Sequence, residues 1–172
     1  MRIETDRLIL REWKSSDKED LIDGLNHFDT AKNLTVPFPY TESDADAFLS
    51  KFSKSDKNKF YFAVEHKAIG KVIGGTNFNL NDDGSNSGGI WINHKFHGQG
   101  FGTEVFSARA RFAFEFLKVE KIYNGFFEFN KTSFAMQQKL GYKIVGCGKS
   151  KSGAHHSRAD YSYYSHFLLL FQ

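Results

Sequence analysis

Apolar and polar positions alternate with a period of two in several stretches of the chain, and this alternation predicts β-strands. In residues 5–13, Leu8 and Leu10 share one face while Arg7 and Arg11 lie on the other, as in a half-buried strand. Residues 60–65 and 71–80 predict two consecutive antiparallel strands. Further strands are expected at residues 89–93, 121–129, 142–145 and 160–171, the last two forming a closing hairpin.

Helical spacing of apolar residues, preceded by capping residues, predicts helices between these strands. Ser16-Asp-Lys-Glu19 offers a capping box for a first helix. Thr41 or Ser43 can cap a second helix that follows the two prolines. Asn130 can cap a last helix, which Gly141 ends.

A longer helix is expected from Thr103, and its apolar stripe is typical of core packing rather than of a cofactor site. The stripe consists of Phe106, Ala110, Ala113 and Leu117, with Val105, Phe112 and Phe116 beside it. The residues expected to face water are Arg109, Arg111, Glu115 and Lys118.

The chain has 172 residues and a net charge of +3, from 23 Lys and Arg against 20 Asp and Glu. This length suits one domain, residues 1–172, able to bury roughly 70% of its unfolded surface. Cys147 is the only cysteine, so an internal disulfide is impossible and a reducing compartment is favoured. Residues 1–7 lack the apolar core of a signal peptide, and the longest apolar run, residues 167–171, is too short to span a bilayer. We therefore expect a soluble, cytoplasmic protein with no membrane partner.

Residues 97–102 form a glycine-rich turn between an expected strand and the long helix. Glycine at positions 98, 100 and 102 gives the backbone access to conformations that side chains forbid and lets a ligand approach closely. Because the first amides of a helix have no intrahelical acceptor, such a turn can bind phosphate. A dinucleotide-binding turn would need glycine where Thr103 stands, and a nucleotide P-loop is excluded because Val72 follows the only Gly-Lys pair. A tight turn without a ligand remains the alternative.

The turn closely resembles the acetyl-coenzyme A loop of the GNAT superfamily of N-acetyltransferases, whose pattern is Gln/Arg-x-x-Gly-x-Gly/Ala. His97 departs from the first position, while Gly100 and Gly102 match. The RimJ/RimL type of ribosomal-protein alanine acetyltransferases is more similar still, since its members read aromatic-Gly-Lys-Gly-Tyr-Ala-Thr-Glu where this chain has residues 97–104. A second signature, Asn-x-x-Ser followed by Leu-Gly-Phe, is matched by Asn130-Lys-Thr-Ser133 and Leu140-Gly-Tyr142. The resemblance runs from about Thr5 to Phe171.

The resemblance implies a layered α+β fold with a central mixed, mostly antiparallel sheet of about six to seven strands, flanked by helices. A splayed strand pair would hold acetyl-CoA, the acyl donor, without a metal. The residues expected to contact the donor are Trp91, Ile92, His97, Gly98, Gln99, Gly100, Phe101, Gly102, Thr103, Asn130 and Ser133.

The resemblance also implies direct attack of a primary amine, at a protein N-terminus or on a small molecule, on the thioester in a ternary complex. Asn130 would bond the pantetheine amides, and Ser133 would protonate the departing thiolate. In most of the superfamily a tyrosine supplies that proton from the position of Gln137, which cannot act as an acid. The general base is left open between Glu128, Glu104 and water.

Phe38 and Tyr40 lie in the segment between the first two expected helices, and in the resembling family this segment forms one wall of the acceptor site. They are either acceptor contacts or aromatic plugs over the helix pair. The basic loop from Lys149 to Arg158 suggests nucleic-acid binding, but a solvated hairpin tip is favoured and no nucleic acid is expected. A non-catalytic acyl-CoA-binding or regulatory domain is the alternative function, and dimers in the resembling group leave a homodimer open.

Overall fold

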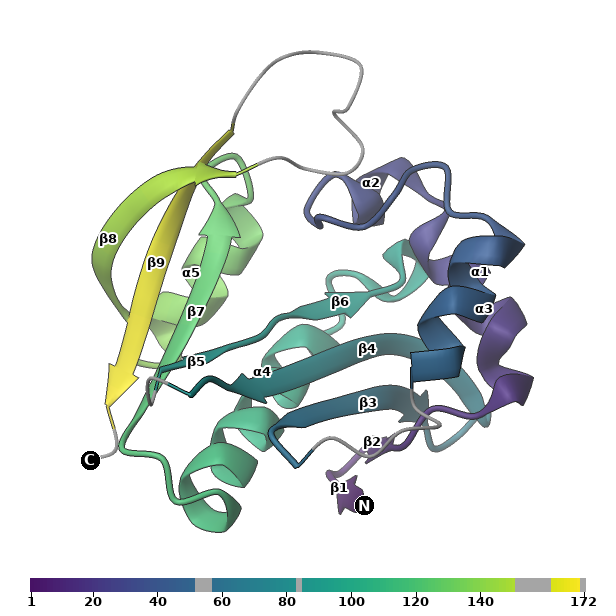
Figure 1. Ribbon diagram of the computed structural model, residues 1–172, viewed down its shortest axis with the longest axis horizontal. Coiled ribbons are helices and arrows are strands. Elements are labelled where there is room, and N and C mark those ends of the chain that lie inside the picture. The colour runs from purple at the N-terminus through teal and green to yellow at the C-terminus, as the bar shows by residue number, and fades with distance from the viewer. Residues whose placement is uncertain (52–56, 83–84, 151–161, 171–172) are drawn as a thin grey trace.

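The computed structural model describes residues 1–51, 57–82, 85–150 and 162–170. Its larger sheet has six strands, with the order β1–β2–β3–β4–β5 and with β6 also paired to β4 (Figure 1). These strands are β1 (Arg2–Glu4), β2 (Leu8–Arg11), β3 (Lys59–His66), β4 (Lys71–Leu80), β5 (Asn86–Ser87) and β6 (Ile90–Ile92). The smaller sheet has the order β7–β9–β8, formed by β7 (Lys121–Phe127), β8 (Lys143–Ser150) and β9 (Ser162–Leu170). Within these ranges every strand pairing is antiparallel.

Helices cover both faces of the larger sheet. One face carries α4 (Phe101–Arg111), whose Val105 and Ala108 pack on Leu8, Leu10 and other strand residues. The opposite face carries α1 (Lys18–Leu25) and α3 (Glu42–Ser50), packed around buried Trp13. The short α2 (Phe28–Ala31) joins them, and α5 (Lys131–Lys139) packs beside β7 in a third apolar cluster. The expected layers, with a mostly antiparallel sheet flanked by helices, are therefore confirmed.

The buried alternation expected in the first strands is present, since Leu8, Leu10 and Val64 are fully buried. Thr41 caps α3 by accepting a hydrogen bond from the amide of Asp44. Asn130 caps α5 in the same way through the amide of Ser133. The β8–β9 hairpin is also as expected, although the loop from Lys149 to Arg158 lies largely outside the described residues.

Three details of the sequence interpretation were wrong. The first helix does not begin at Ser16. A 3-10 turn, Ser15–Asp17, comes before the helix, and the Asp17 carboxylate accepts a hydrogen bond from the Lys14 amide. Arg109 does not face water but is only 2% exposed, since its guanidinium bonds Asn124 and lies near two phenylalanine rings. Phe116 is 64% exposed because α4 gives way at residue 112 to a π-helical segment that rotates the following side chains.

The two sheets meet at one point and diverge from it. At that point the buried Asn86 side chain donates to the carbonyl of Lys121 at 2.7 Å and accepts from the amide of Tyr123 at 2.9 Å. Asn86 thereby mimics one step of strand pairing between β5 and β7. In the described residues no hydrogen bond joins β6 to β7, so the strands open into a V beyond Asn86 (Figure 1).

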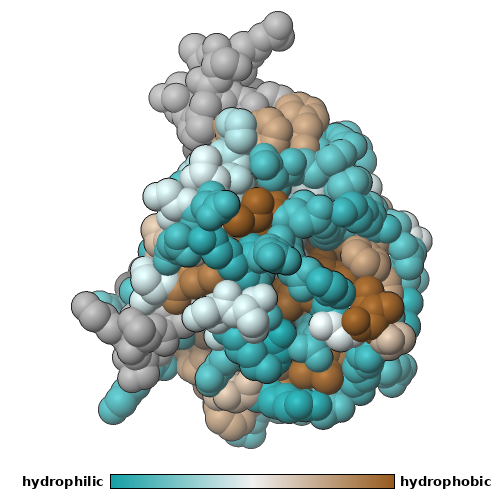
Figure 2. Space-filling view, turned by 90° about the vertical axis from the view of Figure 1, so that its right-hand side faces the viewer, coloured by the Kyte–Doolittle hydropathy of each residue, from teal (hydrophilic) through white to brown (hydrophobic). Residues whose placement is uncertain are grey.

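The molecular face seen from the side of the N-terminal helices is mainly hydrophilic, with its apolar side chains in separate small patches (Figure 2). Over the described residues, none of the helices has the length and hydropathy needed to cross a lipid bilayer.

Candidate active site

The glycine-rich turn at residues 97–102 leads directly into α4, and beyond His97 its amides are unused. No acceptor within the described residues bonds the amides from Gly98 to Thr103, whereas the amide of Glu104 begins the helical pattern by donating to the Gly100 carbonyl. Six consecutive amides at a helix start, together with the positive end of the helix dipole, can bind a diphosphate. The geometry required of an anion-binding turn is therefore present.

Two of the three glycines are required by backbone conformation and the third by space. Gly98 and Gly100 have φ of 74° and 82°, in the left-handed region that side chains disfavour. Gly102 has ordinary helical geometry, but a Cβ there would lie 3.3 Å from the sulfur of Met136 and 3.8 Å from Cδ1 of Ile90. The start of α4 thus approaches both β6 and α5. Met136, which it meets on α5, lies one helical turn after Ser133.

Arg7 and Glu104 hold the turn against the first strands. The Glu104 carboxylate accepts hydrogen bonds from the Thr5 hydroxyl and from the Arg7 amide and guanidinium. Burial raises the pKa of the Glu104 carboxyl, but the bonds from Thr5 and Arg7 outweigh it and hold that pKa below its usual value. Arg7 also donates to the Gln99 carbonyl at 3.0 Å and lies 4.2 Å from the centre of the Phe101 ring. Glu104 therefore fixes the turn and is a poor general base.

Three residues expected at the donor site direct their side chains elsewhere. The His97 ring bonds the Ile92 carbonyl through Nε2 at 2.7 Å, which closes the turn from within. The Ile92 side chain is buried in the cluster beneath α4. Phe101 is likewise a core residue, 3% exposed. At these three positions only the backbone is placed to contact a ligand.

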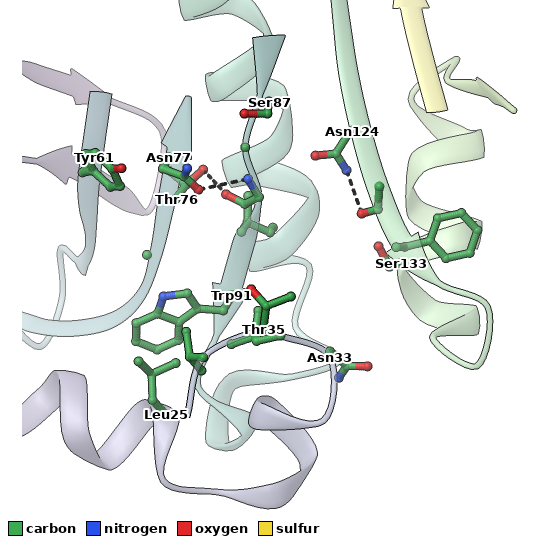
Figure 3. Close-up of a pocket in the computed structure, with 18 of the residues that line it drawn as sticks. Leu25, Asn33, Thr35, Tyr61, Thr76, Asn77, Ser87, Trp91, Asn124 and Ser133 are labelled. Carbon is green, nitrogen blue, oxygen red and sulfur yellow. Dashed lines mark hydrogen bonds between the residues drawn. The ribbon is translucent and has the colours of Figure 1, made fainter. Parts of the chain in front are cut away.

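A pocket of about 410 Å³ occupies the V between β6 and β7 and continues towards α1. Figure 3 shows Asn124 and Ser133 on one side of it, with Trp91, Leu25 and Thr35 on the other. The strand edge between these walls is irregular, because Gly89 bonds the side chains of Thr76 and Asn77. The lining combines segments 33–36, 75–77, 87–91, 124–127 and the side chains Trp13, Leu21, Leu25, Tyr40, Phe48, Tyr61, Asn79, Phe106, Asn130 and Ser133.

Asn130 and Ser133 both line this pocket, at the start of α5. The Oδ1 atom of Asn130 caps the helix, which leaves its Nδ2 to donate to a ligand. The Ser133 hydroxyl oxygen accepts a hydrogen bond of 2.9 Å from Nε2 of Gln137. Gln137 is fully buried, so the position that lacks the tyrosine instead supports the serine. The helical spacing of Ser133 and Gln137 was the only sequence signal for this contact.

The part of the pocket next to α1 is aromatic. Trp13 and Trp91 stack with their ring centres 6.5 Å apart, and Phe48 meets Trp13 edge-on at 5.3 Å. Tyr61 and Tyr40 complete the wall. Burial raises the pKa of Tyr40 to about 12, so its hydroxyl stays neutral.

Phe38, a predicted acceptor contact, and Glu128, a candidate general base, are not in the pocket. Phe38 is absent from the described lining, and its ring packs edge-on against Phe28. Glu128 is exposed and is also outside that lining. The described residues that line the pocket include no Asp, Glu, His, Lys or Arg. The same part of the chain holds no group of three or more His, Cys, Asp or Glu side chains suited to a metal ion.

Comparison with known proteins agrees with this geometry. Residues 7–143 match the family model described as an acetyltransferase (GNAT) domain. An acetyltransferase of the GNAT family from Bacillus anthracis superposes with a TM-score of 0.83 at 21% identity, covering 99% of this chain and 98% of that one. A ribosomal-protein alanine acetyltransferase from Vibrio fischeri gives 0.83 at 16% identity, with 99% and 96% covered. The spermidine N-acetyltransferase from Vibrio cholerae, solved with CoA and spermine, gives 0.81 at 19% identity, with 96% of each chain covered. A search of curated protein sequences found no match.

Proposed function

Because the chain belongs to the acetyltransferase (GNAT) family, we propose that it transfers an acetyl group from acetyl-CoA directly to a primary amine in a ternary complex. The observation that carries the proposal is the row of unused amides from Gly98 to Thr103, which opens a helix beside a pocket lined by Ser133. A diphosphate on those amides and a thioester near Ser133 are two parts of one elongated donor, joined by its pantetheine arm.

The residues present fit the pyrophosphate and the pantetheine arm of acetyl-CoA. The amides at residues 98–103 take the pyrophosphate, as helix starts do. The facing edges of β6 and β7, together with Nδ2 of Asn130, offer donors and acceptors to the amides of the pantetheine arm. The donor brings an activated acyl group. The chain contributes binding, orientation and the exclusion of water, which in reactions of this type supply most of the rate enhancement.

Ser133 supplies the proton that the departing sulfur needs. The hydroxyl borders the pocket and already accepts from Gln137, so its own hydrogen is available to a thiolate. The amine loses its proton to water, since neither Glu104 nor Glu128 reaches the described lining. That first proton leaves the ammonium before attack. The nitrogen loses a second proton once it has attacked the thioester, and this second proton balances the one that the sulfur gains.

The acceptor is an amine with an apolar or aromatic body. The space into which an acceptor would reach is surrounded by aromatic side chains: Trp13, Trp91, Phe48, Tyr61 and Tyr40. One ammonium group is favoured against aromatic faces, and an apolar body gains by burial there. A polyamine would bring further charges into a lining that has no carboxylate among its described residues, which is costly.

An acceptor screen at fixed acetyl-CoA tests the proposal. The panel contains 2-phenylethylamine, unbranched alkyl amines, spermidine and short peptides with a free N-terminus, with release of the CoA thiol as readout. Thiol release that depends on the acceptor, with kcat/KM highest for the aromatic amine, supports the proposal. Preference for spermidine refutes the acceptor class alone. Binding of acetyl-CoA without release for any acceptor refutes transfer and favours the non-catalytic, regulatory domain.

Ser133→Ala tests the assigned role of the hydroxyl. Turnover should fall while the affinity for CoA changes little, because the side chain acts on the departing sulfur rather than on the bound diphosphate. An unchanged rate would remove Ser133 from the chemistry.

We also assign the protein to the RimJ/RimL type and to the cytoplasm, on the support of its two sequence signatures and its single cysteine.

A further inference from the structure

A chain of buried polar side chains leads away from Ser133 into the core. Gln137 donates to Ser133, and the Oε1 atom of Gln137 accepts from Nδ2 of Asn124 at 2.7 Å. Oδ1 of Asn124 in turn accepts from Nη1 of Arg109 at 3.0 Å. Gln137 is fully buried, and Arg109 and Asn124 are 2% and 5% exposed. The chain therefore runs from α4 through β7 to α5 and ends at the pocket.

The direction of every hydrogen bond in this chain follows from its first member. A guanidinium has donors only, so the oxygen of Asn124 must face Arg109 and its amino group must face Gln137. The oxygen of Gln137 must then face Asn124, which turns its amino group towards Ser133. Ser133 can only accept from Gln137, and its single hydrogen is left for the pocket that it lines. The buried positive charge also polarises the chain in the sense that makes the hydroxyl a stronger donor.

We propose that Arg109, Asn124 and Gln137 are positioning residues that fix the Ser133 hydroxyl as a hydrogen-bond donor to the sulfur of CoA. The proposal rests on the transferase function above and adds the residues that make Ser133 effective. The proton passes from Oγ of Ser133 to the thiolate, and the hydroxyl regains a proton from the amine through the pocket, so no other reactant is needed. Arg109 and Gln137 are outside the described pocket lining, whereas Asn124 lines the pocket and acts on Ser133 through Gln137.

Gln137→Glu tests the direction of the last bond with almost no change of shape. An ionised carboxylate can only accept, so it would draw the Ser133 hydrogen away from the sulfur. A protonated carboxyl group can donate as the amide does. We expect kcat to fall by about tenfold or more where residue 137 is ionised, within the range that a proton donor contributes. The ratio of variant to wild-type kcat should recover as the pH is lowered.

Asn124→Asp tests whether direction is transmitted along the chain. The new carboxylate still accepts from Arg109 but cannot donate to Gln137, whose amide should rotate and present its oxygen to Ser133. A fall in kcat is expected although Arg109, Gln137 and Ser133 are all unchanged. Gln138→Glu is the matched control, because Gln138 is the exposed neighbour of Gln137 on α5 and its substitution should leave kcat unchanged.

The pKa of the bound CoA thiol gives a readout that does not depend on turnover. It is followed by the ultraviolet absorbance of the thiolate in the complex, with the apoprotein as reference. A hydroxyl that donates to the sulfur lowers this pKa, so Gln137→Glu and Asn124→Asp should raise it, as should Ser133→Ala. At low pH, Gln137→Glu and Asn124→Asp should bind CoA with wild-type affinity. This binding also shows that both variants are folded.

The outcomes separate the positioning proposal from the transferase function. In a Ser133→Ala background, Gln137→Glu should cause no further loss of kcat. Loss of kcat in Ser133→Ala with wild-type rates and thiol pKa in both Gln137→Glu and Asn124→Asp would overturn the positioning role and leave the function standing. An equal loss for Gln137→Glu with and without Ser133 would also overturn it. A wild-type protein that transfers to no amine would instead overturn the function.

Discussion

Gly24 in α1 leaves room for the Trp91 ring, and adding one methyl group there should disturb the acceptor pocket. A Cβ at position 24 would lie 2.4 Å from Cζ3 and 2.8 Å from Cη2 of Trp91, whereas ordinary contact begins at 3.4 Å. Either the ring or the helix would have to move by about 1 Å. The Trp91 ring cannot simply move away from α1, because it stacks on Trp13 and lies close against Gly75. A Cβ added to Gly75 would be only 2.7 Å from Nε1 of the ring.

The expected cost of Gly24→Ala follows from two opposing effects. Overpacking a core position typically costs about 1–3 kcal/mol. Replacing glycine by alanine within a helix stabilises it by about 1 kcal/mol. The free energy of unfolding should therefore fall by up to about 2 kcal/mol. In a chain of this size about 1 kcal/mol changes Tm by roughly 2–4 °C, so Tm should fall by up to about 8 °C.

A double-mutant cycle with Trp91→Leu isolates the steric contact. Once the indole is gone, Gly24→Ala should stabilise the protein by about 1 kcal/mol, because only the helical preference remains. Thermal unfolding of the four proteins measures the coupling. In otherwise wild-type protein, Gly24→Ala should also raise the acceptor KM while leaving the acetyl-CoA KM unchanged. Stabilisation by Gly24→Ala in both backgrounds would refute the reasoning, since it would show that the ring makes no demand on position 24.

Three other predictions concern the turn, the core and pH. Gly100→Ala places a side chain at φ 82° and should cost about 1–2 kcal/mol, measured by calorimetry as weaker CoA binding or as lost stability. Arg11→Leu leaves buried Asp17 without its guanidinium partner and should lower the unfolding free energy by about 3–5 kcal/mol in denaturant titrations. Burial and the neighbouring His27 lower the pKa of His94 below its usual 6.5, so the folded state favours the neutral ring. The stability that the neutral ring contributes above pH 6.5 should be lost as the pH falls from 6.5 through the pKa of the folded state. His27→Asn should reduce this loss, measured as the change in Tm with pH.

The elements that depend on local pattern were predictable from the sequence. Alternation in the first strands and the capping residue Asn130 are short-range signals, and both agree with the structure. The backbone conformation of the glycine-rich turn was also predictable, because left-handed conformations at Gly98 and Gly100 need glycine. For these features each residue's neighbours along the chain determine its conformation.

The features that depend on long-range contact were not predictable. Periodicity placed Arg109 towards water, yet Asn124 on β7 gives its guanidinium a buried partner. Gln137 was interpreted as a missing acid, since its bond to Asn124 depends on how α5 docks against β7. Helical spacing also cannot foresee the π-helical segment that exposes Phe116. A single sequence carries no signal for such contacts until the elements are packed.

Asn86 explains how the fold keeps a strand edge free for a ligand. Buried backbone groups must be paired, so two adjacent strands would normally close along their whole length. Here the side chain of Asn86 satisfies the backbone of Lys121 and Tyr123 at the base of the V. Beyond that point Gly89 turns its amide to the side chain of Asn77 and its carbonyl to Thr76, which draws β6 towards β4. The Asn86 side chain thus replaces strand pairing at the base of the V. In the described part of the chain the facing edges of β6 and β7 stay unpaired, and there the proposed donor would bind.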